Sequence, residues 1–426
     1  MTPAGTDFRK VETMSQTSGF KRRDFMKLSA QAAAGASLLS TPALARNLDE
    51  YGGFSGNKNF KFIKAPATVF DFGLTPEQEE HAKELHESLI IFDGLSECTF
   101  YPEFITNMKR GGGTSGNFSI GISDMLRWTP ETVFQPEEWW SWEAVNNDLD
   151  ALYRMMHMFR DEAMLTLNHA DILEAKKTGK VGFMPGTQNT KFLDDTVDRL
   201  DRMHRKGLRI IQITYNATNA VGAGSAEAPE NRFGLSRLGH MVVERMNEIG
   251  MLVDTGHSSP ETQIRAAEVS TKPIVISHAG MLSKVNQTRA TTDEAIRTVA
   301  DKGGVMGVIS TPTAIAGSDK CTVEDMIDNV EHAINIAGIE GVGFGSDFII
   351  PSTIEQILSA PEWDEEVVAS IGTFEVWPWS DGNVGWENNS AYPNMTRGLI
   401  KRGYSDEDIA KIMGGNFMRV IKDVIG

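Results

Sequence analysis

The sequence has few of the features that mark disulfide-rich, membrane-spanning or nucleic-acid-binding proteins. It contains only two cysteines in 426 residues, Cys98 and Cys321, so no disulfide framework is expected. Outside the N-terminal region it has no apolar run of the ~18 residues that a transmembrane helix needs. Its 41 basic residues are outnumbered by 58 acidic ones, and the formal net charge of −17 disfavours nucleic acid and anionic membranes as partners.

The first 45 residues have the pattern of an export signal. The pair Arg22–Arg23 is followed by a mildly apolar, Ala-rich stretch over residues 28–39 and by small residues at 43–45. This pattern resembles a twin-arginine signal, which the twin-arginine export machinery reads as an address. We therefore expect cleavage before Arg46 and a periplasmic or secreted mature protein. Residues 46–75 are polar and Gly-rich, and we expect an extended lead-in there.

Short strand-like segments alternate with helical patterns through the rest of the chain, residues 76–426. The expected strands cover residues 89–92, 118–122, 181–184, 208–214, 251–254, 273–277, 305–309 and 342–345. Several are apolar on both faces, as buried parallel strands are. Eight alternations predict an α/β fold, a (β/α)8 TIM-type barrel in one domain. The alternative, an open doubly wound sheet, would need a glycine-rich phosphate loop, which the sequence lacks.

Three polar side chains follow the last apolar residues of three expected strands. They are His257, His278 and Asp347. The carboxyl ends of barrel strands converge on one rim, where active sites lie. Two imidazoles and a carboxylate gathered there can bind a metal and transfer protons.

Two Trp-rich insertions, near residues 128–142 and 363–393, follow expected strands and so lie within reach of the same rim. Their aromatic side chains either shape an apolar pocket or only pack the long loops against the barrel.

An ordered series of motifs resembles the membrane dipeptidase (renal dipeptidase) family, peptidase family M19, of the amidohydrolase superfamily. The motifs are Asp93-Gly94, Gly207-Leu208-Arg209, Asn216 with Asn219, residues 253–257, Ile276-Ser277-His278, Arg289, residues 343–348 and residues 414–420. The resemblance spans roughly residues 85–425.

The resemblance implies a barrel of the metal-dependent hydrolase type with a two-zinc centre that cleaves dipeptides. It implies that His257 and His278 bind the second zinc and that Arg289 pairs with the substrate carboxylate. Asp347 would exchange protons with the attacking water and the leaving amine. Tyr215 stands where the family often has a histidine that contacts the substrate carbonyl, and a phenol can donate the same hydrogen bond.

The chain departs from the family at the first zinc site. Leu95 and Glu97 stand where the family has His and Asp, and Gln188 stands where it has a bridging Glu. Leucine cannot bind a metal, and a neutral amide brings no charge to offset two cations. We therefore expect one zinc per chain, with Glu97 or Gln188 open as a further ligand.

These features predict an exported metal-dependent hydrolase that cleaves dipeptides or similar small amides with metal-activated water. Two alternatives stay open: a metal-dependent enzyme of the same type acting on a lactone, another amide or a decarboxylation, and a metal-free binding protein on the same fold. The partners expected are a small-molecule or dipeptide substrate and the export machinery. The sequence leaves the oligomeric state open, a homodimer included.

Export through the twin-arginine route should depend on Arg22 and Arg23. Replacing both with lysine should retain the full-length precursor inside the cell, because the export receptor reads the arginine pair. Cell fractionation and immunoblotting measure this, with Arg9→Lys as the control. Normal export of the double variant would exclude this route.

Overall fold

The computed structural model describes residues 67–97, 102–121, 139–287, 289–318, 320–348 and 383–426. The expected export signal lies outside the described residues, as do Trp128 and most of the second Trp-rich insertion. The Glu97 side chain also lies outside them.

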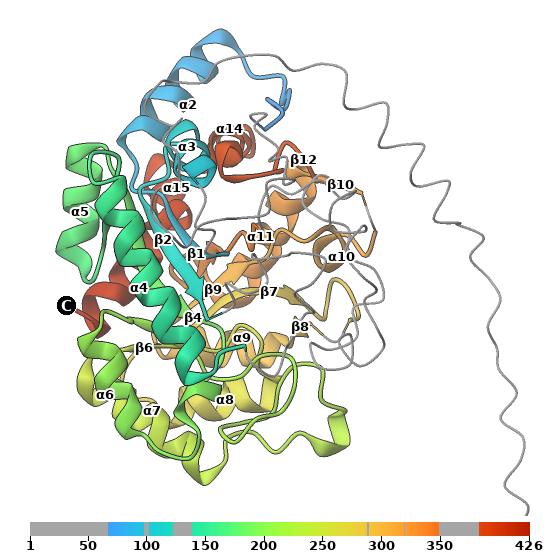
Figure 1. The fold of residues 1–426 in the computed structure, drawn as a ribbon. Coiled ribbons are helices and arrows are strands. Elements are labelled where there is room, and N and C mark those ends of the chain that lie inside the picture. Colours follow the sequence, from blue (N-terminus) through green and yellow to red (C-terminus); the bar gives the residue numbers. More distant parts are fainter. Residues whose placement is uncertain (1–66, 98–101, 122–138, 288, 319, 349–382) are drawn as a thin grey trace, which may run out of the picture. The chain divides into compact units, whose positions relative to one another are not determined.

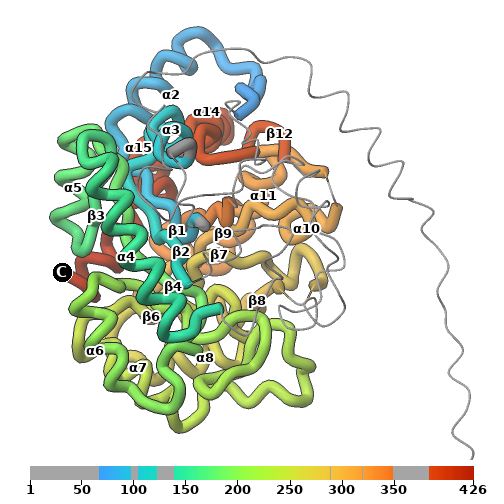
Figure 2. Tube along the Cα trace, viewed as in Figure 1, coloured from blue at the N-terminus to red at the C-terminus, as the bar shows by residue number. Residues whose placement is uncertain are grey.

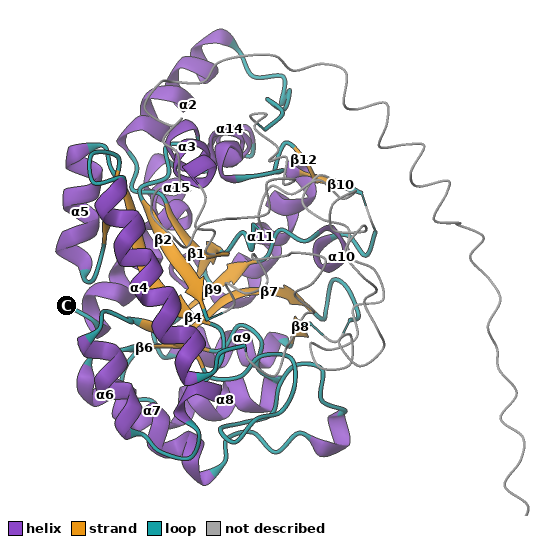
Figure 3. Cartoon of the chain, in the orientation of Figure 1, coloured by secondary structure: helices purple, strands orange, loops and turns teal. Residues whose placement is uncertain are grey.

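Eight parallel strands form the central sheet, and helices surround it (Figures 1 and 3). In spatial order the strands are β1 (Phe92–Glu97), β2 (Ser115–Ile120), β4 (Val181–Thr187), β5 (Ile210–Gln212), β6 (Leu252–Asp254), β7 (Val275–Met281), β9 (Val305–Val308) and β11 (Val342–Phe344). Two short strands, β3 (Ala163–Leu165) and β8 (Ala290–Thr291), pair with β4 and β7. Between β11 and β1 the Asp347 N–H donates to the Leu95 carbonyl at 2.9 Å, so the sheet is a nearly closed barrel. The predicted (β/α)8 TIM-type fold is confirmed.

Helices precede or connect the strands around the barrel (Figure 1). The longer ones are α2 (Pro76–Ser88), α3 (Pro102–Arg110), α4 (Trp142–Met158), α5 (His169–Thr178), α6 (Asp198–Arg205), α7 (Arg237–Ile249), α8 (Pro260–Val269), α9 (Asp293–Asp301), α11 (Val323–Ala337), α14 (Tyr392–Lys401) and α16 (Asn416–Val424). The C-terminus lies beside α5 (Figure 2), where the His169 N–H donates to the Gly426 carbonyl at 2.8 Å.

Local sequence signals set where the helices begin. Thr75 caps α2 in a capping box with Gln78, and Pro76 occupies the first turn, where no N–H partner is needed. Ser236 and Thr292 cap α7 and α9 in the same way, each accepting a backbone N–H. These caps fix where the three helices begin.

The eight expected strands are all present in the expected order, but their bounds differ from the expected ones, most of all for the strands expected over residues 89–92 and 273–277. The strand expected over residues 89–92 begins only at Phe92, because Leu89 ends α2 and donates its N–H back to that helix. The strand expected to end at Ser277 continues to Met281, across an irregular register with β9, so that His278 lies within it.

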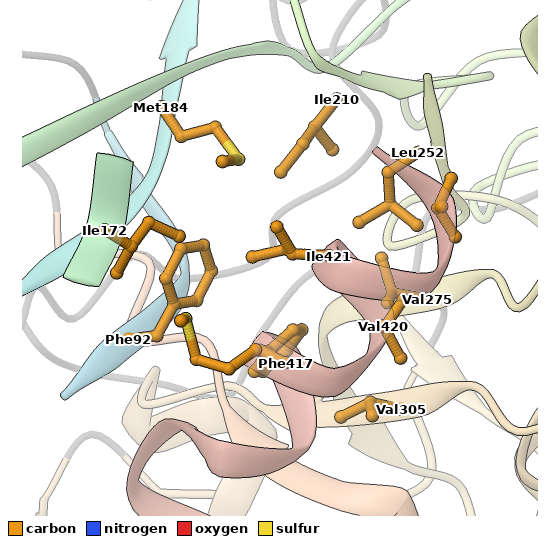
Figure 4. Close-up of a cluster of buried hydrophobic side chains, with 12 residues drawn as sticks. Phe92, Ile172, Met184, Ile210, Leu252, Val275, Val305, Phe417, Val420 and Ile421 are labelled. Carbon is orange, nitrogen blue, oxygen red and sulfur yellow. The ribbon is translucent and has the colours of Figure 1, made fainter. Parts of the chain in front are cut away.

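A cluster of buried apolar side chains closes the end of the barrel where the strands begin (Figure 4). Its members are Phe92, Ile172, Met184, Ile210, Leu252, Val275, Val305, Phe417, Met418, Val420, Ile421 and Val424. Helix α16 contributes five of these and lies across the strand starts, so the C-terminal segment completes the core. The opposite end of the barrel, where the strands finish, is left for polar side chains.

Glycines in neighbouring strands make room for the Phe417 ring. A Cβ atom on Gly94 would lie 2.5 Å from this ring, and one on Gly343 would lie 2.7 Å from it. The ring also lies 5.7 Å from the Phe92 ring, between centroids. The Asp93-Gly94 motif and the motif at residues 414–420 thus pack against each other.

No helix of the described residues is both long and apolar enough to cross a membrane.

Phe417→Ala should destabilise the fold by about 3–5 kcal/mol, because it removes a buried ring and leaves a cavity between glycines that cannot fill it. Urea denaturation followed by circular dichroism measures the change. Leu173→Ala on α5, where the side chain is 43% exposed, is the control and should cost little. A similar small loss for both variants would show that α16 does not support the barrel.

Candidate active site

The histidine pair, His257 and His278, lies at the carboxyl end of the barrel strands. His257 is in the loop three residues beyond β6, and His278 is in β7. Both side chains are buried, and their Nε2 atoms are 3.0 Å apart. Two side chains that follow different strands therefore converge on one point.

Hydrogen bonds at Nδ1 determine which nitrogen of each imidazole is free to bind a ligand. His257 Nδ1 lies 2.7 Å from Asn216 Oδ1, and His278 Nδ1 lies 2.7 Å from Ser277 Oγ. Both oxygens can accept a hydrogen bond from a protonated Nδ1, which leaves the two Nε2 lone pairs facing each other. Such an arrangement is repulsive unless a proton or a cation lies between the lone pairs.

A metal ion satisfies this arrangement better than a proton does. Burial, together with the positive charge of Arg289, lowers the pKa of both imidazoles well below the ordinary value. Zinc–nitrogen distances of about 2.0–2.1 Å place both Nε2 atoms within reach of one ion. Polar partners at the second nitrogen are also typical of metal-binding histidines. The histidine pair fits one zinc ion.

Asp347 lies beside the histidine pair, directly after β11. Its Oδ1 is 4.0 Å from His278 Nε2, and its side chain is 16% exposed. Its backbone has a φ of 54°, a left-handed conformation that is unusual for aspartate. Burial raises the pKa of Asp347 to about 7, with Arg289 lowering it and Asp93 raising it. A carboxyl group with such a pKa can both accept and donate a proton near neutral pH.

Two buried charges, which we call the peptide clamp, hold the segments that carry the histidines. The Asp254 carboxylate accepts the N–H of Gly256 at 2.9 Å and the N–H of Ser277 at 3.0 Å. The Arg289 guanidinium donates to the Gly256 carbonyl and, at 3.0 Å, to the His278 carbonyl. The peptide groups next to both histidines are therefore fixed from two sides.

The clamp requires glycine at position 256. A Cβ atom there would lie 2.8 Å from Gln212 Oε1 and 2.9 Å from both His278 Nδ1 and Ser277 Oγ. These contacts are too short for any side chain. Gly256 thus lets the His257 loop approach β7 closely enough for the imidazoles to meet.

A second buried carboxylate, Asp93 in β1, positions Asp347. It accepts the Ser346 N–H at 2.8 Å and the Leu95 N–H at 3.3 Å. It also accepts the Ser346 hydroxyl and, at 2.7 Å, the Tyr392 hydroxyl. Burial raises the pKa of Asp93 to about 7 against the lowering effect of these hydrogen bonds. The residue just before Asp347 is therefore anchored to the first strand.

The structure brings together all five side chains that the sequence singled out. Tyr215 stacks on His257, with ring centroids 4.0 Å apart and planes 21° apart. Arg289 contacts the backbone on both sides of the pair, as described above. Their roles in binding and catalysis remain predictions.

The side of the site where the family binds a first zinc is poor in ligands. Leu95 is buried, and Gln188 follows β4 with its Nε2 3.2 Å from Ser119 Oγ. Within the described part of the chain, no three His, Cys, Asp or Glu side chains cluster so as to hold a metal. The further protein ligand that the sequence leaves open is Gln188 or Glu97.

Sequence reasoning missed Asp93 and Asp254 as positioning residues. Both lie inside strands, where their spacing gives no sign that they bond to a neighbouring strand. The signal available was that both belong to motifs that the sequence singled out, Asp93 to Asp93-Gly94 and Asp254 to residues 253–257.

The sequence model of the membrane dipeptidase family (peptidase family M19) matches residues 80–376 and 378–425 of this chain. The chain belongs to the membrane dipeptidase family. Dipeptidase tcpJ of Claviceps purpurea is 28% identical over 363 residues, 83% of this chain and 78% of that protein. Dipeptidase verJ of Clonostachys rogersoniana is 26% identical over 286 residues, 67% of this chain and 66% of that protein.

Solved structures agree with the family and the fold. An amidohydrolase from Pseudomonas aeruginosa has a TM-score of 0.69 and 26% identity, over 81% of this chain and 99% of that one. A metallopeptidase from Rhodobacter sphaeroides, solved with a phosphinate mimic of the dipeptide L-Ala-D-Ala, has a TM-score of 0.62 and 16% identity, over 79% and 99%. As a member of the membrane dipeptidase family, the chain is a hydrolase of the metal-dependent type.

Asp254→Asn should change how stability depends on pH. Burial raises the pKa of Asp254 from 3.8 to about 6, so the native state binds its proton more tightly than the unfolded state does. The wild-type protein should therefore lose stability through this group as pH rises from about 4 to 6, whereas the uncharged amide should not.

The free energy of unfolding of Asp254→Asn relative to wild type should rise by up to about 3 kcal/mol across this range, at 1.36 kcal/mol per pKa unit. Urea titrations at several pH values measure it. A difference that is constant from pH 4 to 7 would contradict the buried-carboxylate assignment.

Proposed function

We propose that this protein is an exported, single-metal hydrolase of dipeptides or related small amides that carry a free carboxylate. The observation that carries the proposal is the convergence of the two buried Nε2 atoms, 3.0 Å apart, beside the carboxylate of Asp347. Membership of the membrane dipeptidase family supports the reaction class, and the mimic of L-Ala-D-Ala bound by one structural neighbour supports the substrate class.

His257 and His278 would hold the ion, with Gln188 or Glu97 as the further protein ligand. A bound zinc ion supplies a water molecule of lowered pKa, about 7, and polarises a carbonyl group. The Nδ1 partners described above keep both Nε2 lone pairs available for it.

Asp347 would carry the proton during the reaction. Its carboxylate accepts a proton from the attacking water and returns it to the leaving amine, and a pKa of about 7 allows both steps at neutral pH. Asp93 keeps this carboxylate at the rim by fixing Ser346. Without a carboxylate at this point, the leaving amine would depart unprotonated, which is slow.

Arg289 would attract the substrate carboxylate. Burial lowers its pKa to about 10, which still leaves it charged at neutral pH. An incoming carboxylate pairs well with a guanidinium in a buried setting. The same residue holds the two histidine segments, so its loss should impair both substrate binding and the histidine pair.

Export rests on the sequence alone. The residues of the proposed signal precede the described part of the chain, and the Arg22–Arg23 pair is what supports this part of the proposal.

Asp347→Asn should lower kcat for L-Ala-D-Ala and L-Ala-L-Ala by about 10²–10⁴-fold, because the amide keeps the shape of the side chain but cannot transfer the proton. Zinc content and melting temperature should stay near wild type. Asp301→Asn, at an exposed position at the end of α9, is the control. A fully active Asp347→Asn would exclude this mechanism. Wild-type protein that is loaded with zinc and cleaves no small amide would exclude the function.

A further inference from the structure

An aromatic column leads away from the histidine pair. The Tyr215 ring stacks on His257, and the Trp140 ring lies 4.7 Å from Tyr215 between centroids. Trp139 meets Trp140 edge-on at 5.6 Å. The first Trp-rich insertion therefore reaches the active site through Trp140, two ring contacts from His257.

The backbone holds Trp140 in an unusual conformation. Its φ is 52°, a value that residues other than glycine rarely adopt. Its backbone N–H donates to the Gly121 carbonyl at 2.8 Å. A Cβ atom on Gly121 would lie 2.9 Å from the Trp140 ring. Backbone strain of this kind is found where a side chain has a functional position to keep.

The Trp140 indole N–H is a buried donor with no acceptor in the described part of the chain. The side chain is 5% exposed, and its Nε1 has no acceptor among the residues that the structure describes. Buried donors in folded proteins are nearly always paired. A ligand oxygen is the natural partner for an N–H group next to an active site.

The spacing suits the part of a substrate beyond the cleaved bond. Two extended residues span about 7 Å. The Tyr215 ring lies 4.0 Å from the His257 ring, and the Trp140 ring lies 4.7 Å from the Tyr215 ring. A substrate with its scissile amide at the histidine pair is therefore long enough to extend past Tyr215 towards Trp140. The Trp140 indole N–H is a donor, so it suits a carbonyl oxygen and not an ammonium group.

The charges near the site also disfavour a free amino terminus. Arg289 is a buried cation, and a metal on the histidine pair would add more positive charge. Asp93 and Asp254 are buried and already accept backbone N–H groups. Asp347 is the remaining described carboxylate at the histidine pair, and the reaction itself uses it.

We propose that Trp140 is a specificity-determining residue whose indole N–H binds the acyl oxygen of an N-acylated substrate. The preferred substrates are then N-acyl dipeptides with a free carboxylate, ahead of dipeptides with a free amino group. This inference rests on the proposed amide hydrolysis and names its substrate class.

A matched pair of substrates tests the inference. L-Ala-L-Ala and N-acetyl-L-Ala-L-Ala share the scissile bond and the carboxylate, and differ only in an ammonium or an acetamide group. Wild-type kcat/KM should be about tenfold higher for the acetylated substrate, the gain expected of one neutral hydrogen bond.

Trp140→Phe keeps an aromatic ring against Tyr215 but removes the N–H. Its kcat/KM should fall about tenfold on the acetylated substrate and little on the free dipeptide. Its melting temperature should stay equal or rise, because the variant no longer buries an unpaired donor. Trp140→His, which restores a ring N–H, should recover part of the loss. Trp139→Phe is the control and should match wild type.

Equal kinetics of Trp140→Phe and wild type on the acetylated substrate, or a wild-type preference for the free dipeptide, would overturn the inference and leave amide hydrolysis intact. Cleavage of neither substrate would overturn the proposed function. In that case calorimetric titration with N-acetyl-L-Ala-L-Ala tests the hydrogen bond from Trp140 without any reaction. Weaker binding by Trp140→Phe than by Trp139→Phe supports this hydrogen bond, and equal binding excludes it.

Discussion

The candidate active site depends on one constraint: two peptide segments that tend to separate are held together by buried charges. β6 ends at Asp254, and its only ladder pair with β7 is Asp254 with Val275. The strands therefore diverge just where the histidines follow. The peptide clamp of Asp254 and Arg289 joins the two segments at this point: Asp254 accepts the Ser277 N–H, and Arg289 donates to the His278 carbonyl. Together with the Thr255 N–H, which donates to the Val275 carbonyl at 2.8 Å, the clamp keeps the imidazoles at a common point.

The described side chains that can bind a metal come mainly from one side of the barrel. On the side of β6, β7 and β11 it has two imidazoles, a guanidinium and a carboxylate. On the side of β1 and β4, the described side chains at the positions of the family's first zinc are Leu95 and the neutral Gln188, and the Asp93 carboxylate is bonded to Ser346 and Tyr392. Fewer anionic ligands can neutralise fewer metal charges, which favours one ion over the two of the family. The indole donor of Trp140 favours a neutral acyl group over an ammonium group in the substrate.

Much of the fold followed from the sequence because apolar runs and helix caps are local signals. The eight strands and the meeting of His257, His278 and Asp347 rest on such signals, combined with the rule that strand ends share one rim. Asp93 and Asp254 could not be found in this way. Their hydrogen bonds cross to other strands, so they depend on register and on where strands separate. Trp140 was placed in a loop that could line a pocket, but its left-handed backbone and unpaired N–H are properties of the folded chain.

The one-metal centre is tested most directly by counting metal in protein purified without chelators and equilibrated with zinc. Plasma mass spectrometry should find about one zinc per chain in the wild type and almost none in His257→Ala or His278→Ala, as expected if two imidazoles carry the site. Two tightly held ions per chain, or an ion that survives loss of either histidine, would contradict it.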